Sequence, residues 1–140
     1  MSIEEKVRAV CADALPEFTY IFATDWFDIS RIVSKSPLPA AVNILPVSGT
    51  MEVRNGRRYD VENGAVAFVD KVPKDATGED NAKVYNRMKD AAFAFIRKLN
   101  NSGYFEPVSE AVGFSVIYEQ LTSITTGVML DIQFRELPQC

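Results

Sequence analysis

The sequence predicts an α+β fold, in which an antiparallel or mixed β-sheet carries an N-terminal helix and one long helix packed on one face, with a protruding β-hairpin. Three observations predict it. Two segments place apolar residues at helical spacing, several short segments alternate apolar and polar residues, and Asn55-Gly56 separates two of these short segments. A chain of 140 residues has the size of one domain, so residues 1–140 are expected to form a single domain.

The first helix is expected to run from Ile3 to Leu15. Ser2 and Glu5 have the spacing of a capping box, in which each side chain pairs with a backbone N–H of the first turn. Pro16 stops the helix. Apolar residues recur along one face, and the residues expected to face water are Glu4, Lys6, Arg8 and Asp13.

A second, longer helix is predicted from Glu79 to Leu99, because apolar residues form a continuous stripe over this range. Thr77 with Asp80 offers the N-cap, and the run from Asn100 to Gly103 supplies the C-terminal stop. The aromatic residues of this region are expected in the core: Phe93, Phe95, Tyr104 and Phe105.

Two strands are predicted before the hairpin. Phe18 to Ala23 alternates aromatic residues with smaller ones, as a strand does. Ala40 to Leu45 is almost wholly apolar, which favours a central strand covered on both faces. Between them, Thr24 to Pro39 shows no clear period and is expected to be an irregular connection.

The hairpin is predicted after Pro46, where Thr50 to Arg54 and Arg57 to Val61 flank Asn55-Gly56, a dipeptide that supplies the positive φ angles of a tight turn. Asn63-Gly64 marks a further turn.

The chain is then expected to return as an apolar strand from Ala65 to Val69. Strands are also expected at Phe114 to Leu121 and Val128 to Arg135, with a polar turn at Thr122 to Gly127 between them. These last two should form an antiparallel pair.

Composition excludes several kinds of catalytic and metal site. The chain has no histidine, which removes Ser/His/Asp triads and His-containing zinc sites, and its two cysteines are too few for a thiolate zinc site. The seven glycines are scattered, so no glycine-rich loop is present to hold a nucleotide. We expect a protein that is not an enzyme and that has no cofactor and no metal.

Charge and hydropathy limit partners and location. A net charge of -4 argues against general phosphate binding, so no sequence-specific nucleic acid is expected. The N-terminus lacks the pattern of an export signal, and no apolar run approaches the roughly 20 residues of a membrane span. A cytoplasmic protein without a membrane partner is therefore expected.

Two carboxylate pairs leave alternatives open. Glu119 and Asp131 fall on strands expected to be neighbours, and could form an acid and base pair or a hard-cation site. Alternating strands with one wet face present such carboxylates routinely, however. Asp25 and Asp28 around Trp26 suit a ligand pocket or the capping of a short helical turn.

The candidate subunit-contact residues are Arg54, Arg57 and Arg58 together with Trp26 and Phe27. The three arginines flank the predicted hairpin turn and would grip an acidic partner surface or a phosphate chain. A solvated, charged hairpin edge that discourages aggregation is the competing interpretation.

The order of elements resembles the tail-terminator and tail-completion proteins of long-tailed bacteriophages, which close the tail tube or lie at the head-to-tail neck. The resemblance is carried by the N-terminal helix through Leu15, the apolar stretch Leu38 to Pro46, the hairpin at Asn55-Gly56, the long helix from Glu79 to Leu99 and the two closing strands. It spans most of the chain and is one of pattern, without diagnostic residues.

The resemblance implies an architecture and partners. Family members form ring-like homo-oligomers, commonly hexamers, whose sheets and hairpin arms contact neighbouring subunits and tail-tube or neck proteins. It implies assembly in the host cytoplasm and a place in the virion if the chain is phage-encoded. The alternative is a small-molecule or peptide-binding accessory domain that uses the concave side of the sheet with Trp26, Phe27 or Tyr118.

Overall fold

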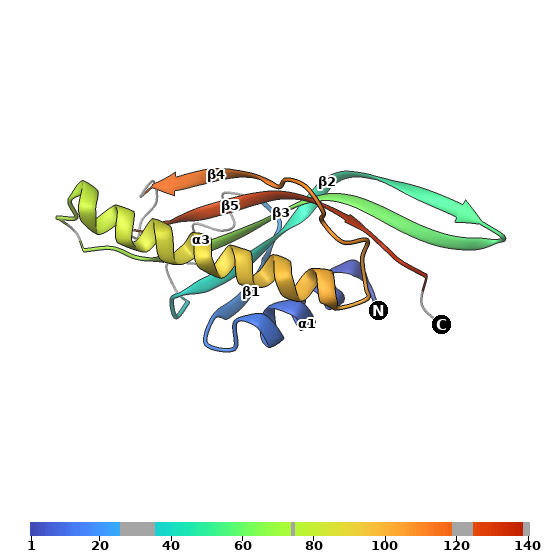
Figure 1. Cartoon of the computed structure of the whole chain (residues 1–140), viewed down its shortest axis with the longest axis horizontal. Helices are drawn as coiled ribbons and strands as arrows, with labels where there is room; N and C mark the ends of the chain where they lie inside the picture. Colours follow the sequence, from blue (N-terminus) through green and yellow to red (C-terminus); the bar gives the residue numbers. More distant parts are fainter. Residues whose placement is uncertain (26–35, 74, 119–124, 139–140) are drawn as a thin grey trace.

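The computed structural model describes residues 1–25, 36–73, 75–118 and 125–138. Figure 1 shows how these residues are arranged. In chain order the elements are α1 (Ile3–Ala14), β1 (Thr19–Ala23), β2 (Ala40–Arg54), β3 (Arg57–Lys71), α3 (Gly78–Asn101), β4 (Gly113–Tyr118) and β5 (Thr125–Arg135). The expected α+β fold is confirmed.

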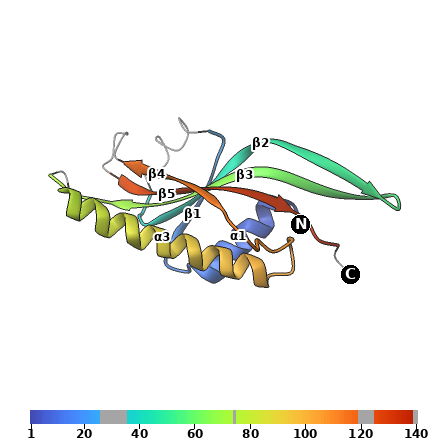
Figure 2. The same ribbon diagram turned by 45° about the horizontal axis from the view of Figure 1, so that its top comes forward.

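The strands form one mixed sheet in the order β1-β2-β3-β5-β4 (Figures 1 and 2). β1 lies parallel to β2, and the other neighbours are antiparallel. The predicted central position of Ala40 to Leu45 is confirmed, because β2 pairs with β1 on one side and with β3 on the other over Ala40 to Ile44. β4 is an edge strand of the sheet.

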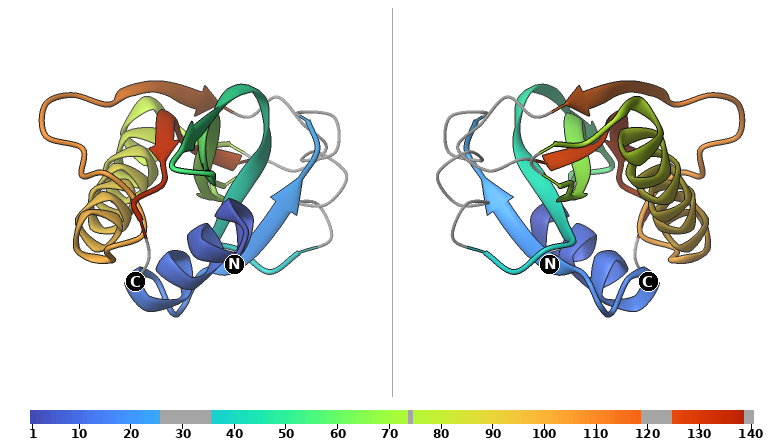
Figure 3. Two further views of the ribbon diagram at one scale, coloured as in Figure 1. Left: turned by 90° about the vertical axis from the view of Figure 1, so that its right-hand side faces the viewer. Right: turned by 90° about the vertical axis from the view of Figure 1, so that its left-hand side faces the viewer.

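Both helices cover the same face of the sheet, as the end-on views show (Figure 3). α1 begins with the expected capping box of Ser2 and Glu5, and the expected N-cap of α3 at Thr77 is also a capping box, with Asp80. Their apolar stripes share one core cluster with side chains from three strands. The largest fully buried members of that cluster include Phe68, Phe95, Phe105, Met88 and Leu99.

β2 and β3 are longer than expected and form one continuous hairpin. The expected break at Pro46 is a bulge, in which Leu45 to Val47 lie opposite Gly64 alone. A proline is tolerated at a bulge because its missing N–H removes no ladder bond there. Pairing then continues to Arg54 and Arg57, and Asn55 and Gly56 have the expected positive φ angles, 53° and 76°.

Asn63-Gly64 was expected as a turn, and this prediction is wrong because both residues lie within β3. The Asn63 side chain bonds across the sheet, accepting from Gln133 and donating to Ser48. At Gly64 the ring of Phe134 takes the space of a side chain, since a Cβ would lie 2.9 Å from Phe134 Cε2. A non-local contact therefore explains this glycine.

The expected polar turn before Val128 is also wrong over Thr125 to Gly127, which belong to β5. Both threonines are buried, and the Thr126 hydroxyl donates to Asn81 Oδ1 of α3 at 2.6 Å. Buried hydroxyls with a partner are compatible with a core strand. Residues 119–124 lie outside the described part of the chain.

The distal half of the β2/β3 hairpin projects beyond the body of the molecule (Figure 1). β5 follows β3 only as far as the Val61–Arg135 pair, and β1 follows β2 only as far as Ile44. Thr50 to Asp60 is called the arm below. Past its base it is a two-stranded ribbon with no strand beside it among the described residues.

Gly127→Ala should strongly destabilise the protein. Gly127 pairs with Val69, and a Cβ there would lie 1.9 Å from the carbonyl oxygen of Phe68, a backbone atom that cannot rotate away. We expect a loss of about 3 kcal/mol in the free energy of unfolding, measured by urea denaturation.

The matched control is Gly78→Ala, because no atom lies within 4 Å of a Cβ at this position at the start of α3. Its stability should be unchanged or slightly raised, since alanine favours a helix over glycine. Equal losses in the two variants would contradict the close strand approach at Gly127.

Candidate subunit-contact site

The arm exposes apolar side chains on one face. Met51 and Val53 are 71% and 72% exposed. They pair with Asp60 and Arg58 of β3, which places them on the helix-covered face of the sheet because β3 alternates without interruption towards Phe68. Two large apolar residues at the end of a ribbon without a covering layer are a surface that a partner would bury.

The structure places the three predicted arginines at the tip but divides them between the two faces. Arg54 and Arg57 are opposite each other, and the Arg54 guanidinium lies 4.5 Å from the centre of the Tyr59 ring. Arg58 points to the other face, where its Nε lies 3.3 Å from Asp60 Oδ1. The arginines therefore make a basic tip with two sides and not one grip.

Trp26, Phe27, Asp28 and Glu119 lie outside the described residues. Asp131 pairs with Gly113 on one side and with Ala65 on the other.

Glu136 holds the base of the arm to the body. Its Oε2 lies 2.5 Å from Lys6 Nζ of α1, and its Oε1 accepts the backbone N–H of Asp60 at 3.0 Å. The Glu136 backbone N–H donates in return to the Asp60 carbonyl. Glu136, the residue directly after β5, therefore joins the first helix to β3 at the base of the arm.

Lys6 was expected to face water, and this prediction is wrong because it is only 5% exposed. Its ammonium group also lies 5.9 Å from the centre of the Phe105 ring and 6.0 Å from that of Tyr104. Helical spacing alone could not identify this burial, because the partner carboxylate is 130 residues away in the chain.

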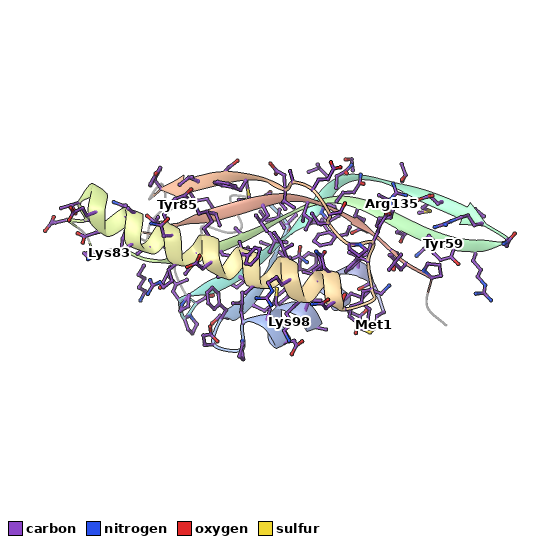
Figure 4. All side chains as sticks on the ribbon, viewed as in Figure 1. Met1, Tyr59, Lys83, Tyr85, Lys98 and Arg135 are labelled. Atoms are coloured by element: carbon purple, nitrogen blue, oxygen red, sulfur yellow. The ribbon has the colours of Figure 1, made fainter. Side chains whose placement is uncertain are left out.

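Arg135 makes the matching connection on the opposite face of the sheet (Figure 4). Its guanidinium forms an ion pair with Glu52 of the arm, and its Nε lies 3.3 Å from Glu106 in the segment after α3. We call Arg135 and Glu136 together the clamp. Because consecutive strand residues point to opposite faces, the clamp holds the arm from both sides.

Charge at the clamp shifts two carboxyl groups in opposite directions. Burial raises the pKa of Glu136, but hydrogen bonds from Lys6 and Asp60 and the charges of Lys6 and Arg58 outweigh it and hold that pKa below its usual range. The pKa of Glu62 is raised by burial and by the charges of Asp60 and Glu136. Ionisation of Glu136 therefore stabilises the fold, whereas ionisation of Glu62 destabilises it.

A second exposed apolar surface lies between α3 and β4. A groove of about 340 Å³ has a mainly apolar lining that includes Ala92, Phe93, Ile96, Val108, Val112, Phe114 and Leu130. Phe93 was expected in the core, and this prediction is wrong because it is 61% exposed. It belongs to a stripe of α3 at four-residue spacing, Tyr85, Lys89, Phe93 and Arg97.

β4 continues this surface along the edge of the sheet. Phe114, Val116 and Tyr118 are exposed and share the helix-covered face, because they pair with Leu130, Val128 and Thr126. No described residue pairs with the outer edge of β4. An exposed apolar edge strand is a template for another strand.

The described residues offer little for other kinds of site. No cluster of three or more carboxylate or thiol side chains among them could hold a metal ion. No helix within the same residues is long and apolar enough to cross a membrane.

Removing the Glu136 charge should cost more stability than removing that of Lys6. Glu136→Gln leaves an unpaired ammonium group in a buried place, which typically costs about 3 kcal/mol. Lys6→Met replaces the lysine by an apolar residue of similar length and leaves Glu136 its bond from Asp60. The double variant Lys6→Met with Glu136→Gln should lose less free energy of unfolding than the sum of the two single losses. Urea denaturation of the unaltered protein, the two single variants and the double variant tests this.

The pH dependence of stability gives an independent readout of the same pair. The Glu136 pKa is lowered in the fold, so its contribution is complete above the usual carboxyl range and is lost as the pH falls through the lower folded value. Glu136→Gln should remove this acid-side loss, whereas Glu62→Gln should raise stability at neutral pH. Parallel stability curves for Glu136→Gln and the unaltered protein would contradict the assignment.

Comparisons with known proteins identify no relative. The chain matches no family model, and it matches no curated protein. The function must therefore be inferred from the arm, the clamp and the edge of the sheet.

Proposed function

We propose that this protein is a structural subunit that associates with copies of itself through the arm and works by assembly and not by catalysis. The observation that carries the proposal is the exposure of Met51 and Val53 at the end of a ribbon with a basic tip. An isolated two-stranded ribbon is only marginally stable in water, so a partner that covers it supplies stability that the body does not.

The positions of the exposed surfaces favour head-to-tail association. The arm lies at one end of the long axis, and the start of α3 and the end of β4 lie at the other (Figure 1). Two unlike surfaces on one subunit generate a ring if the rotation between copies closes, and a filament if it does not. A ring-like homo-oligomer such as a hexamer agrees with the resemblance to tail-terminator and tail-completion proteins.

The same resemblance supplies the wider proposal. The subunit would close a phage tail tube or join the neck, with tail-tube or neck proteins as its further partners. It would assemble in the host cytoplasm and remain in the virion. The basic tip and the apolar face of the arm suit such protein-protein contacts, because arginine and methionine are enriched in interfaces.

Arg57→Glu with Arg58→Glu should weaken self-association and lower the melting temperature of the monomer only slightly, because the Arg58 side of the ion pair with Asp60 is exposed. Both residues are exposed at the tip, away from the core. Light scattering over a concentration series, with negative-stain images of the same samples, measures the association.

Met51→Ser with Val53→Ser should raise the dissociation constant at least roughly tenfold, since burying each aliphatic side chain is worth about 1.5 kcal/mol or more.

The control for charge is Arg8→Glu with Lys98→Glu, which changes the net charge equally at two exposed positions on α1 and α3, outside the arm and β4. Assembly should be unaffected by this pair. If the arm variants and the control assemble alike, the arm takes no part in self-association.

A second candidate function is supported by the groove between α3 and β4. Its mainly apolar lining includes two cations of α3, Lys89 and Arg97, and one carboxylate, Glu110, and the Lys89 ammonium lies 6.0 Å from the centre of the Phe114 ring. A groove of this kind suits an apolar anion or an acidic peptide. This is the specific observation in favour of a ligand-binding accessory domain.

The groove can be tested with anilinonaphthalene sulfonate, an aromatic anion. The native protein should bind the dye with a rise in fluorescence, and Phe93→Ser should abolish most of that rise without changing stability because Phe93 is exposed. Exposed Val47 provides the matched control, Val47→Ser. Equal dye binding by both variants would remove the groove as the binding site.

A further inference from the structure

We infer that the arm of one copy pairs, through the outer edge of β2, with the outer edge of β4 in the next copy, which joins the two sheets into one. This inference rests on the proposed self-association and names the surface that receives the arm. It uses two edges of the same chain that no described residue covers, β2 beyond Ile44 and β4 along its length. Free edges carry unpaired backbone donors and acceptors, and strand pairing satisfies them.

The β2 edge is available where the β3 edge is not. At the base of the arm, the backbone N–H and carbonyl of Asp60 in β3 are both taken by Glu136. On the other side of the ribbon, pairing of β2 with β1 ends at Ile44, well before the arm begins. The clamp therefore closes one edge of the arm at its base and leaves the other open.

The side chains of the two edges match on the helix-covered face. Met51 and Val53 form an apolar row on the helix-covered face of the arm, and Phe114, Val116 and Tyr118 form such a row on the same face of β4. A joined sheet would bring these rows side by side, since residues two apart have the same spacing in every strand. Cross-strand aromatic and aliphatic pairs of this kind stabilise a sheet.

Charge selects the antiparallel direction. In that direction the tip of the arm meets the start of β4, where Glu110 is an exposed carboxylate three residues before Gly113. The basic tip would then lie near an opposite charge. With Arg54 beside Gly113, Val53 lies opposite Phe114 and Met51 lies opposite Val116.

Disulfide trapping between copies tests this pairing. Two variants that each carry one introduced cysteine, Val53→Cys and Phe114→Cys, are mixed, allowed to exchange subunits and oxidised, both in a Cys140→Ser background. Cys11 can remain because its thiol is buried, which also raises its pKa to about 12. The mixture should give a linked dimer on a non-reducing gel. A second mixture contains Val116→Cys in place of Phe114→Cys. It tests a register shifted by two residues, which would also keep the apolar side chains of both strands on the same face.

The control mixture pairs Val53→Cys with Ser115→Cys, which points to the opposite face of β4. We expect at least roughly tenfold less linked dimer from this mixture, because two cysteine side chains on opposite faces of a sheet cannot adopt the geometry of a disulfide. The mass of each mixture is measured before oxidation. Assemblies that link no better at 114 or 116 than at 115 would overturn the pairing and leave self-association standing, whereas monomers at every concentration would overturn both.

Discussion

The ion pair between Lys6 and Glu136 is the interaction on which the position of the arm depends. It joins the first helix to the end of the last strand, and the same carboxylate accepts the backbone N–H of Asp60 where β3 enters the arm. Arg135, the preceding residue, reaches Glu52 from the opposite face. A two-stranded ribbon would otherwise swing at its base, so these two neighbouring residues give it a direction. Burying a charged pair costs solvation free energy, which is compatible with a role in specifying one arrangement of the arm.

An arm with a fixed direction lowers the entropic cost of association. Ordering a mobile segment at an interface costs conformational entropy, and a segment that is already held in its bound direction avoids much of that cost. The arm lies at one end of the long axis and β4 runs away from it towards the other end (Figure 1), so one subunit cannot cover both of its exposed surfaces by itself. Copies arranged head to tail can cover both surfaces of each subunit. Self-association would then cover the apolar side chains that the folded monomer leaves in water, including Met51, Val53 and Phe114.

The sequence predicted what depends on neighbouring residues. The capping box of α1, the N-cap of α3 and the Asn55-Gly56 turn were predicted correctly, because each needs only residues a few positions apart. The errors have non-local causes. Gly64 has no side chain because Phe134 fills that space, and Lys6 is buried because Glu136 meets it from the far end of the chain. For the site, the arginines of the tip were located, but their division between two faces follows from a strand register that composition does not reveal.

The measurement that tests the central claim most directly is amide hydrogen exchange, followed residue by residue over a concentration series. If the arm pairs with the β4 edge of the next copy, the amides of Thr50 to Arg54 and of Gly113 to Tyr118 that point away from β3 and β5 should exchange quickly in dilute protein and become protected together as the concentration rises. Amides of the buried strands, such as Val66 and Val128, should be protected throughout. Protection that develops elsewhere on the molecule, with the arm and β4 unchanged, would contradict the account.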